Sequence, residues 1–527
     1  MGPVVSLPVL DRGFPGGGPK EKCGVLGVWG HPDAVHLTYL GLYAQQHRGQ
    51  ESAGIAVTDG VRISGHTGMG LVPDVFDERT LADLESARRG VRRRIGQATG
   101  GVIGHNRYST TGASVACNAQ PLIERFVAGE VAVAHNGNLI NAEALREMFG
   151  ESGHLFHTTS DTEVVIHLLA SPEQRRSPDP LAATLRRLQG AFSMVFLFPD
   201  RIEAARDPWG WRPLVLGRFP DGRDCVASET VALDVMGAEV VREVEPGEIV
   251  TLSDSGVESR RFAPPAERLA RCVFEHVYFA NPASHVFGQN VLVAREAMGA
   301  KLAEEAPADA DYVMPMPDSG RSAANGYARR QRHPVPRGHR AQPVCRADVH
   351  RRRRASGSVV RSQAQHRLRD RLRAPHHRGG RPRSRARHDD AGEDGPAREA
   401  RASRSTPAIS CPPITHPCWG RDFATPGQLI VHDMSVEEIR AYLGVDSPAY
   451  LELRHEGLLG DEPRPRELLH GVLHGRLPHR RRPPDDRAGG VQRRWGCSSG
   501  ACTRRTSLEE SVLPTHAGSR GHGDLGG

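Results

Sequence analysis

The chain has 527 residues and a net charge of +7 at pH 7, with an isoelectric point of about 9.1. This length allows two or more domains with large hydrophobic cores. No uninterrupted apolar run reaches the ~18 residues that a membrane helix needs, so we expect no membrane span. The nine cysteines are an odd number without a disulfide-like spacing. They favour a reducing compartment, and we predict a cytoplasmic protein.

The positive charge comes almost wholly from arginine, because lysine occurs only at positions 20, 22 and 301. A basic chain invites a nucleic-acid-binding function. Selection for a basic surface would ordinarily use both residue types, whereas a GC-rich gene favours arginine codons. The excess of arginine is therefore weak support for nucleic-acid binding.

Residues 1–22 are rich in glycine and proline, and the apolar stretch 4–10 is too short and too interrupted for a signal peptide. We predict that this segment is a removable propeptide, so that Cys23 becomes the first residue of the mature protein. Such a cysteine carries nucleophile and base together, because its thiol attacks a carbonyl and its free α-amine relays the proton. The alternative for Cys23 is a buried core thiol.

From Cys23 to about residue 250 the pattern is that of a folded protein with short strands and a few helices. Periodicity predicts helices at 37–46 and 162–169, the second with Ser160 or Asp161 near its N-cap. Buried strands are predicted at 25–29, 54–57, 101–104, 131–134 and 192–198. Together they indicate a layered α+β domain.

Polar side chains gather where these predicted elements begin or end. Arg107 follows one strand, Asn136 and Gly137 form a predicted tight turn after another, and Asp161 opens a helix. Arginine can bind a carboxylate, aspartate can pair with an ammonium, and an Asn side chain with a Gly N–H can form an oxyanion hole. Together these groups describe a site for a free α-amino acid whose side-chain carbonyl is attacked. Singly, they also fit a surface ion pair, a hairpin turn and a helix cap.

Six motifs follow one another over this half of the chain. They are Cys-Gly-Val at 23–25, Gln-His-Arg-Gly-Gln-Glu-Ser-Ala-Gly at 46–54, the arginine segment at 104–110, His-Asn-Gly-Asn-Leu at 135–139, Ser-Asp-Thr-Glu at 160–163 and Arg-Asp-Pro-Trp-Gly-Trp-Arg-Pro-Leu at 206–214. In this order they resemble the glutaminase half of the amidophosphoribosyltransferases. That family makes phosphoribosylamine from glutamine and phosphoribosyl pyrophosphate in the first step of purine synthesis.

The resemblance implies an N-terminal-nucleophile hydrolase fold, a four-layer αββα sandwich, for residues 23–255. It implies that Cys23 is the nucleophile and that Asn136 with the N–H of Gly137 holds the oxyanion. It also implies that Arg107 binds the carboxylate of glutamine and Asp161 its ammonium. A homo-oligomer is expected on the same ground.

The resemblance continues through 272–284, although the family usually has an arginine where this chain has Asn281. Met-Pro-Asp-Ser-Gly at 316–320 resembles the start of the family's phosphoribosyltransferase site. This implies that Asp318, Ser319 and Gly320 are what remains of the phosphoribosyl pyrophosphate site, with Ser319 near a Mg²⁺ ion. An α/β phosphoribosyltransferase-type domain would then occupy 256–330 and 405–454.

Some members of the family hold a [4Fe-4S] cluster with four cysteines. Cys272 and Cys418 fall on two of the four positions. A buried structural thiol is the alternative for each.

Residues 331–404 lose the character of a folded protein, because they contain no aromatic residue and no isoleucine. Such a segment cannot bury enough apolar surface to fold. A one-base frameshift explains it, since GC-rich codons for 332–340 read one base later can give Gly-Ile-Pro-Phe-Pro-Glu-Gly-Ile-Val. The frame recovers near Ser405. In the segment that follows, Ser435 and Glu438 form a capping box for a helix that runs to about Leu443. We predict no stable fold for 331–404 and 455–527, and little or no transferase activity.

Two rival functions remain. Another amidotransferase with the same glutaminase half, of the glucosamine-6-phosphate or asparagine synthetase type, is disfavoured by the motif at 316–320. An arginine-rich nucleic-acid-binding protein is disfavoured because the basic segments coincide with the apparent frame changes.

Overall fold

The computed structural model describes residues 23–94, 100–108, 115–310, 312–315, 319–335, 407–411, 435–443, 449–451 and 468–469. All of them lie within one unit of the chain, residues 1–478. In these ranges no helix is long and apolar enough to cross a membrane.

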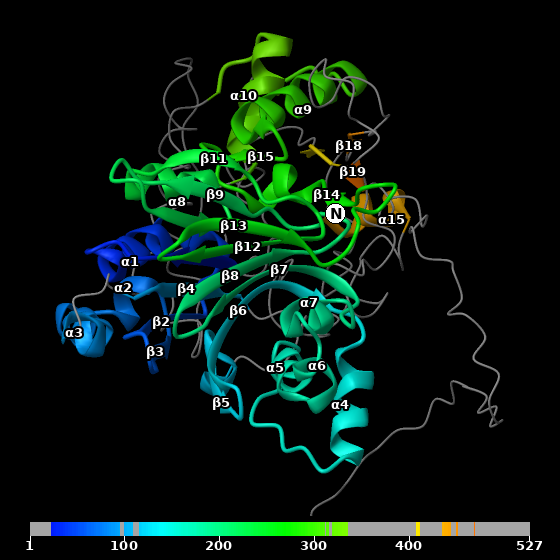
Figure 1. Ribbon diagram of the computed structural model, residues 1–527. Coiled ribbons are helices and arrows are strands. Elements are labelled where there is room, and N and C mark those ends of the chain that lie inside the picture. Colours follow the sequence, from blue (N-terminus) through cyan, green and yellow to red (C-terminus); the bar gives the residue numbers. More distant parts are fainter. Residues whose placement is uncertain are drawn as a thin grey trace, which may run out of the picture. The chain divides into compact units, whose positions relative to one another are not determined.

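Two antiparallel sheets form the centre of the region that follows Cys23 (Figure 1). The strands of the first sheet are β1 (Gly24–Val28), β2 (Ser52–Thr58), β3 (Ile63–Met69), β4 (Val102–Arg107), β9 (Val215–Arg218), β10 (Asp224–Ala227) and β11 (Glu239–Glu243). Those of the second are β5 (Leu122–Phe126), β6 (Gly129–Leu139), β7 (Gly190–Leu197), β8 (Arg201–Arg206), β12 (Glu248–Ser253) and β13 (Gly256–Arg261). Their orders are β11-β9-β10-β1-β4-β2-β3 and β13-β12-β8-β7-β6-β5.

Helices cover the outer face of each sheet. The first sheet is covered by α1 (Ala34–Ala44), α2 (Val72–Val75), α3 (Glu78–Arg94) and α8 (Thr230–Met236). The second is covered by α4 (Ala142–Glu151), α5 (Glu163–Ala170), α6 (Pro172–Arg175) and α7 (Pro180–Leu185). A separate apolar core lies between the sheets, and β6 shows the alternation, since Val133 packs under the helices while Ala132 and Ala134 face the other sheet. The layer order confirms the predicted αββα sandwich.

All the predicted strands are present. Each one is either longer than its predicted range or shifted from it by a residue or two. The helix predicted at 37–46 begins earlier, at Ala34, and the one predicted at 162–169 is α5, with Thr162 as its N-cap. The predicted tight turn at 135–138 is wrong. These residues continue β6, whose pairing with β7 runs on to Leu139 opposite Gly190.

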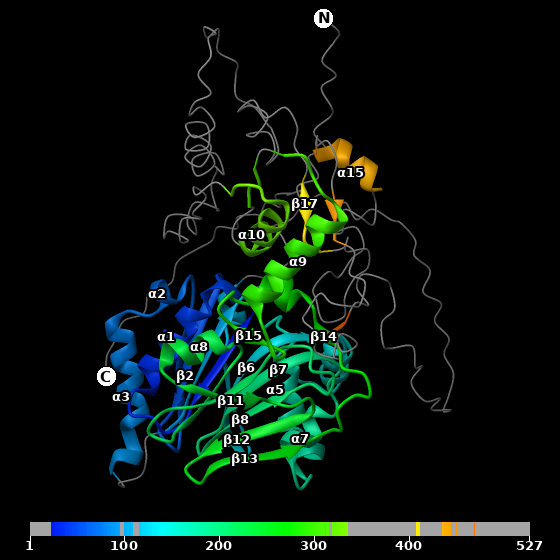
Figure 2. The same cartoon turned by 90° about the horizontal axis from the view of Figure 1, so that it is seen from above.

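Two helices dominate the region after the sandwich. It contains β14 (Arg271–Cys272), a π-helical turn η3 (Glu275–Phe279), β15 (His285–Val286), β16 (Gln289–Asn290), α9 (Val291–Glu305) and α10 (Gly320–Gln331). Figure 2 shows α9 and α10 side by side. They cross closely, because a Cβ on Gly299 would lie 1.8 Å from the carbonyl oxygen of Ala323, and one on Gly326 would lie 1.9 Å from that of Glu296. Only glycine allows the two backbones to approach this far.

Short elements are described further along the chain: β17 (Ala408–Ile409), α15 (Val436–Leu443), β18 (Ala449–Tyr450) and β19 (Leu468–Leu469). The predicted capping box of α15 is confirmed, since the Glu438 N–H donates to Ser435 Oγ at 3.3 Å and the Ser435 N–H donates to Glu438 Oε2 at 2.8 Å. Of the two segments predicted to be out of frame, only 331–335 and 468–469 are among the described residues, and the rest lies outside them.

Candidate active site

Three strands direct polar side chains into the space between the two sheets. Val25 of β1, Ile103 of β4 and Ala134 of β6 belong to the core between the sheets. Because side chains alternate along a strand, Cys23, Arg107 and Asn136 point to the same side as these residues. The site therefore lies between the sheets, next to the start of β1.

Cys23 is buried, and its thiol donates to the carbonyl oxygen of Tyr108 at 3.7 Å. Burial raises the pKa of the thiol above its usual value, although the positive charges of Arg107 and Arg212 oppose the shift. The resting thiol is therefore protonated at neutral pH, and attack on a carbonyl requires a base.

Asn136 and Gly137 lie side by side in β6. Asn136 is 2% exposed, and none of the described residues accepts a hydrogen bond from its Nδ2. Gly137 has φ of +156°, and a Cβ there would lie 2.0 Å from the carbonyl oxygen of Ala191. A buried amide donor without a partner is costly, so its presence here points to a ligand acceptor.

Asp161 lies just before α5 and is almost fully buried. Its Oδ2 accepts from the Leu139 N–H at 2.9 Å and lies 3.8 Å from Nδ1 of His135. Burial alone would raise the pKa of Asp161, but the interactions with His135 and the Leu139 N–H outweigh it and lower the pKa below its usual value. Asp161 therefore stays a carboxylate at neutral pH.

Two amide side chains, which the sequence analysis did not identify, bind the residues around Asp161. Asn118 donates to Thr159 Oγ1 at 2.7 Å and accepts from the Thr159 N–H at 2.9 Å. Gln120 accepts from the His135 N–H at 2.8 Å and donates to Thr162 Oγ1 at 2.9 Å. Asn and Gln are too common in loops for the sequence to identify such a role.

His105 and Ser52 also face the space between the sheets, and the sequence did not single them out either. His105 Nε2 donates to the carbonyl oxygen of His135 at 3.0 Å, and burial lowers the pKa of His105 to about 3, so the ring is neutral. Ser52 pairs directly with Arg107 across β2 and β4. Within the described ranges, neither His105 Nδ1 nor Ser52 Oγ has a hydrogen-bond partner.

Of the predicted phosphoribosyl pyrophosphate site, Ser319 and Gly320 lie at the N-terminus of α10, where the Ser319 side chain makes no capping hydrogen bond. Asp318 lies outside the described residues. One hydroxyl does not hold a Mg²⁺ ion, which binds through carboxylates and phosphates in an octahedron of oxygens.

Of the two predicted cluster ligands, Cys272 is buried in β14 and Cys418 lies outside the described residues. Cys272 pairs with Leu469 of β19, and a leucine cannot bind iron. Across the described ranges no three His, Cys, Asp or Glu side chains gather as metal ligands. The residues that the structure describes therefore do not fit a four-cysteine cluster.

A family model for a glutamine amidotransferase domain matches residues 105–235. The chain is 38% identical over 454 residues to an amidophosphoribosyltransferase of Bacillus subtilis, an alignment that covers 84% of this chain and 90% of that protein. It is 39% identical over 456 residues to a chloroplastic amidophosphoribosyltransferase of Glycine max, covering 84% of this chain and 76% of that one. The fold is also similar to a solved structure, that of the glutamine phosphoribosylpyrophosphate amidotransferase of B. subtilis complexed with ADP and GMP. The two match with a TM-score of 0.68 and 34% identity, over 86% of this chain and 97% of that one.

Proposed function

The chain belongs to the amidophosphoribosyltransferase family, and we propose that the site at Cys23 is the glutaminase that releases ammonia for the first step of purine synthesis. The single observation that carries this proposal is the buried Asn136 amide, which points between the two sheets as Cys23 does and has no acceptor among the described residues. The similarity to amidophosphoribosyltransferases over both halves of the chain favours this family over another amidotransferase and over a nucleic-acid-binding protein.

We propose that removal of residues 1–22 exposes the α-amine of Cys23. The amine accepts the thiol proton while Sγ attacks the side-chain carbonyl carbon of glutamine. Asn136 Nδ2 and the Gly137 N–H donate to the oxyanion of the tetrahedral intermediate. The C–N bond then breaks, the proton returns to the leaving nitrogen as ammonia leaves, and a thioester remains. Water hydrolyses the thioester to glutamate and restores the thiol.

The substrate ends are bound by opposite charges. Arg107 binds the α-carboxylate in a bidentate manner and Asp161 pairs with the α-ammonium. Ser52, which lies directly opposite Arg107, adds a hydroxyl donor to the same carboxylate. The low pKa of Asp161 supports this assignment, because the residue must be ionised to bind an ammonium.

In the family's second step, ammonia attacks C1 of phosphoribosyl pyrophosphate and expels pyrophosphate. Ser319 and Gly320 are the described residues of this chain that we assign to that site. Because 331–404 reads as out of frame, we propose that this chain retains glutaminase activity and makes little phosphoribosylamine. We also propose that it does not assemble the iron–sulfur cluster, because only Cys272 and Cys418 fall on the family's four cysteine positions.

The proposed organisation is a propeptide at 1–22, a glutaminase domain at 23–255 and parts of a phosphoribosyltransferase domain at 256–330 and 405–454. We further propose a homo-oligomer in the cytoplasm, on the family resemblance and on the odd number of cysteines without a disulfide-like spacing. Size-exclusion chromatography with light scattering and cell fractionation test these two points.

Two measurements on the expressed full-length chain test the function. Intact mass shows whether residues 1–22 are lost, and separate assays follow glutamate release and phosphoribosylamine formation. We expect glutamate release from the processed chain with little phosphoribosylamine. A processed chain that releases no glutamate contradicts the glutaminase assignment, and abundant phosphoribosylamine contradicts the loss of the second activity.

A further inference from the structure

A buried ion-pair network lies against the main chain of Cys23. Its centre is Arg48, the last residue of the 3₁₀ turn η1 (Gln46–Arg48), whose side chain is 0% exposed. Arg48 Nε donates to the carbonyl oxygen of Cys23 at 2.9 Å. Its two terminal nitrogens donate to the two carboxylate oxygens of Glu275 at 2.9 Å each. Arg48 Nη1 also pairs with Glu229.

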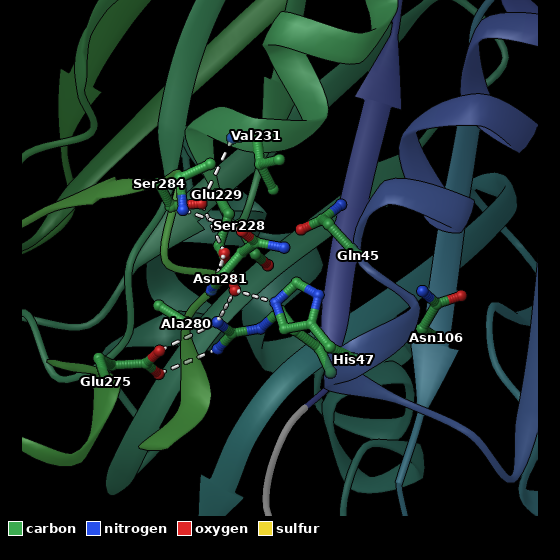
Figure 3. A network of polar contacts seen from close by, with 12 residues as sticks. Gln45, His47, Asn106, Ser228, Glu229, Val231, Glu275, Ala280, Asn281 and Ser284 are labelled. Atoms are coloured by element: carbon green, nitrogen blue, oxygen red, sulfur yellow. Dashed lines mark hydrogen bonds and ion pairs between the residues drawn. The ribbon is translucent and has the colours of Figure 1, made fainter. Parts of the chain in front are cut away.

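The two carboxylates come from different parts of the chain. Figure 3 shows the side chains of Glu229 and Glu275 pointing toward the same guanidinium group, with Asn281 and Ser284 beside Glu229. Glu229 is the N-cap of α8 in the sandwich, whereas Glu275 opens η3, beyond the proposed domain boundary at 255. Glu229 also accepts from the Asn281 N–H at 2.8 Å and from Ser284 Oγ at 2.7 Å. The network therefore joins the glutaminase sandwich to the segment that follows it.

Charge pairing explains why Arg48 can be buried. Burial alone would lower the pKa of its guanidinium, but Glu275 and Glu229 raise it, so Arg48 stays charged. A guanidinium is planar, and two parallel hydrogen bonds to one carboxylate fix its orientation. Glu275 therefore determines where Nε points, and Nε holds the carbonyl of Cys23.

The main chain just after Cys23 is held by the neighbour of Glu229. The Val25 N–H donates to Ser228 Oγ at 2.9 Å, and the Ser228 N–H donates to the carbonyl oxygen of Val25 at 3.0 Å. Both ends of the segment that carries the nucleophile are thus bound to fixed groups. A reacting atom must lie within about 1 Å of its working position, since a misplacement of this size can cost about 100-fold in rate.

The turn η3, which carries Glu275, is held by α9, and the Glu275 carboxylate is also bound by the sandwich. Arg295 of α9 is buried, and it donates through Nε to the carbonyl oxygen of His276 and through Nη2 to that of Ala280 at 2.8 Å. Arg212 Nη1 donates to Glu275 Oε1 at 3.4 Å. The position of the carboxylate therefore depends on η3 and α9 as well as on the sandwich.

We propose that Glu275 is a positioning residue of the glutaminase, which fixes the carbonyl of Cys23 through Arg48 although it lies outside the amidotransferase domain. The segment after the sandwich then completes the glutaminase site. This inference rests on the proposed glutaminase function of Cys23.

The test compares Glu275→Gln with Glu203→Gln in the full-length processed chain. Glu203 is also buried, and it pairs with Arg260 and Arg201 on the outer face of the second sheet. Both substitutions remove a buried carboxylate from an ion pair, although the arginine partners of Glu203 are partly exposed. Only the first substitution acts on Cys23. We expect Glu275→Gln to lower kcat for glutamine hydrolysis about 10- to 100-fold with KM within about twofold, because glutamine is bound by other residues. Glu203→Gln should leave kcat unchanged.

Arg48→Lys gives an independent measurement, because lysine keeps the charge but cannot bind Cys23 and Glu275 together. If Arg48 and Glu275 act as one unit, the double variant is no slower than the slower single variant. Circular dichroism and thermal unfolding establish that each variant is folded. Should Glu275→Gln fail to fold, Glu275→Asp and Arg48→Lys replace it with the same expected loss of kcat at unchanged KM.

A folded Glu275→Gln chain with a kcat within twofold of the unsubstituted chain overturns the proposal. So does a loss of kcat equal to that of Glu203→Gln. Failure of the underlying function is distinct, because the unsubstituted processed chain would then release no glutamate.

Discussion

Replacing Asn136 by alanine should separate catalysis from stability. The amide Nδ2 is buried without an acceptor among the described residues, so its removal breaks no hydrogen bond there and relieves an unsatisfied donor. Loss of one oxyanion-hole donor typically costs about 100- to 1,000-fold in kcat, or about 2.7–4 kcal/mol. An unsatisfied buried group costs about 1–3 kcal/mol, which offsets the cavity that a shorter side chain leaves. We therefore expect a large loss of kcat with little change in the free energy of unfolding.

Asn106→Ala is the matched control. Asn106 is equally buried, in β4 of the other sheet, but faces α1, where its Nδ2 donates to the carbonyl oxygen of Leu42 at 2.7 Å. Its removal breaks this hydrogen bond but also removes the Oδ1 atom, which has no partner among the described residues. We therefore expect a fall of about 1 kcal/mol in the free energy of unfolding, with kcat nearly unchanged. The assays are glutamate release at saturating glutamine and urea unfolding. The reasoning is wrong if Asn136→Ala keeps most of its kcat, or if it loses as much stability as Asn106→Ala.

Charges near the nucleophile should change its reactivity in opposite directions. Arg107 lowers the pKa of the Cys23 thiol and Asp161 raises it. Arg107→Gln should therefore slow the alkylation of Cys23 by iodoacetamide at fixed pH, Asp161→Asn should accelerate it, and both should raise KM for glutamine. Alkylation rates that change in the same direction in the two variants would contradict this. Ser52→Ala should raise KM for glutamine by about 10-fold with kcat little changed, because one hydrogen bond to a charged group is worth roughly 1.5 kcal/mol. An unchanged KM would remove Ser52 from the site. Burial lowers the pKa of His105 to about 3, whereas in the unfolded chain the imidazole takes up a proton near pH ~6.5. As the pH falls from ~6.5 toward 3, the free energy of unfolding therefore decreases by about 1.4 kcal/mol per pH unit because of this residue. Urea unfolding at a series of pH values should therefore show a free energy of unfolding that falls less steeply with decreasing pH in His105→Gln. The same dependence on pH in both chains would refute this.

Short apolar runs were enough to predict β1, β2, β4, β6 and β7, because these strands are buried on both faces for most of their length. The other strands of the sandwich were not predicted, and β3, β5, β11 and β13 are exposed along much of their length, so they leave no such run. The αββα order came from the family resemblance, since no single strand says which layer it joins. The prediction failed at 135–138 because Asn-Gly is typical of a hairpin turn. In the structure Gly137 serves a different need, since the carbonyl of Ala191 leaves no room for a Cβ.

The predicted site residues Cys23, Arg107 and Asn136 point into the space between the sheets, and the charges of Arg107 and Asp161 both act on the Cys23 thiol. Their residue types predicted the parts of one substrate, and the assignment of these parts stays a proposal. Ser52 could not be found from the sequence. Its hydroxyl gains meaning only from the register that places it opposite Arg107, and no local pattern encodes that register.

The same limit applies to the boundary at residue 255, which was placed where the recognisable motifs of the sandwich end. Glu275 lies beyond it, yet its carboxylate is one of two that balance the buried charge of Arg48. Removing that carboxylate would leave an arginine with incomplete pairing against the backbone of Cys23, at a cost of several kcal/mol. Arg295 in turn joins η3 to α9, and α9 meets α10 through Gly299 and Gly326. On the proposed role of Glu275, the glutaminase as a physical unit extends at least to α9, and the segment after the sandwich contributes to glutamine hydrolysis.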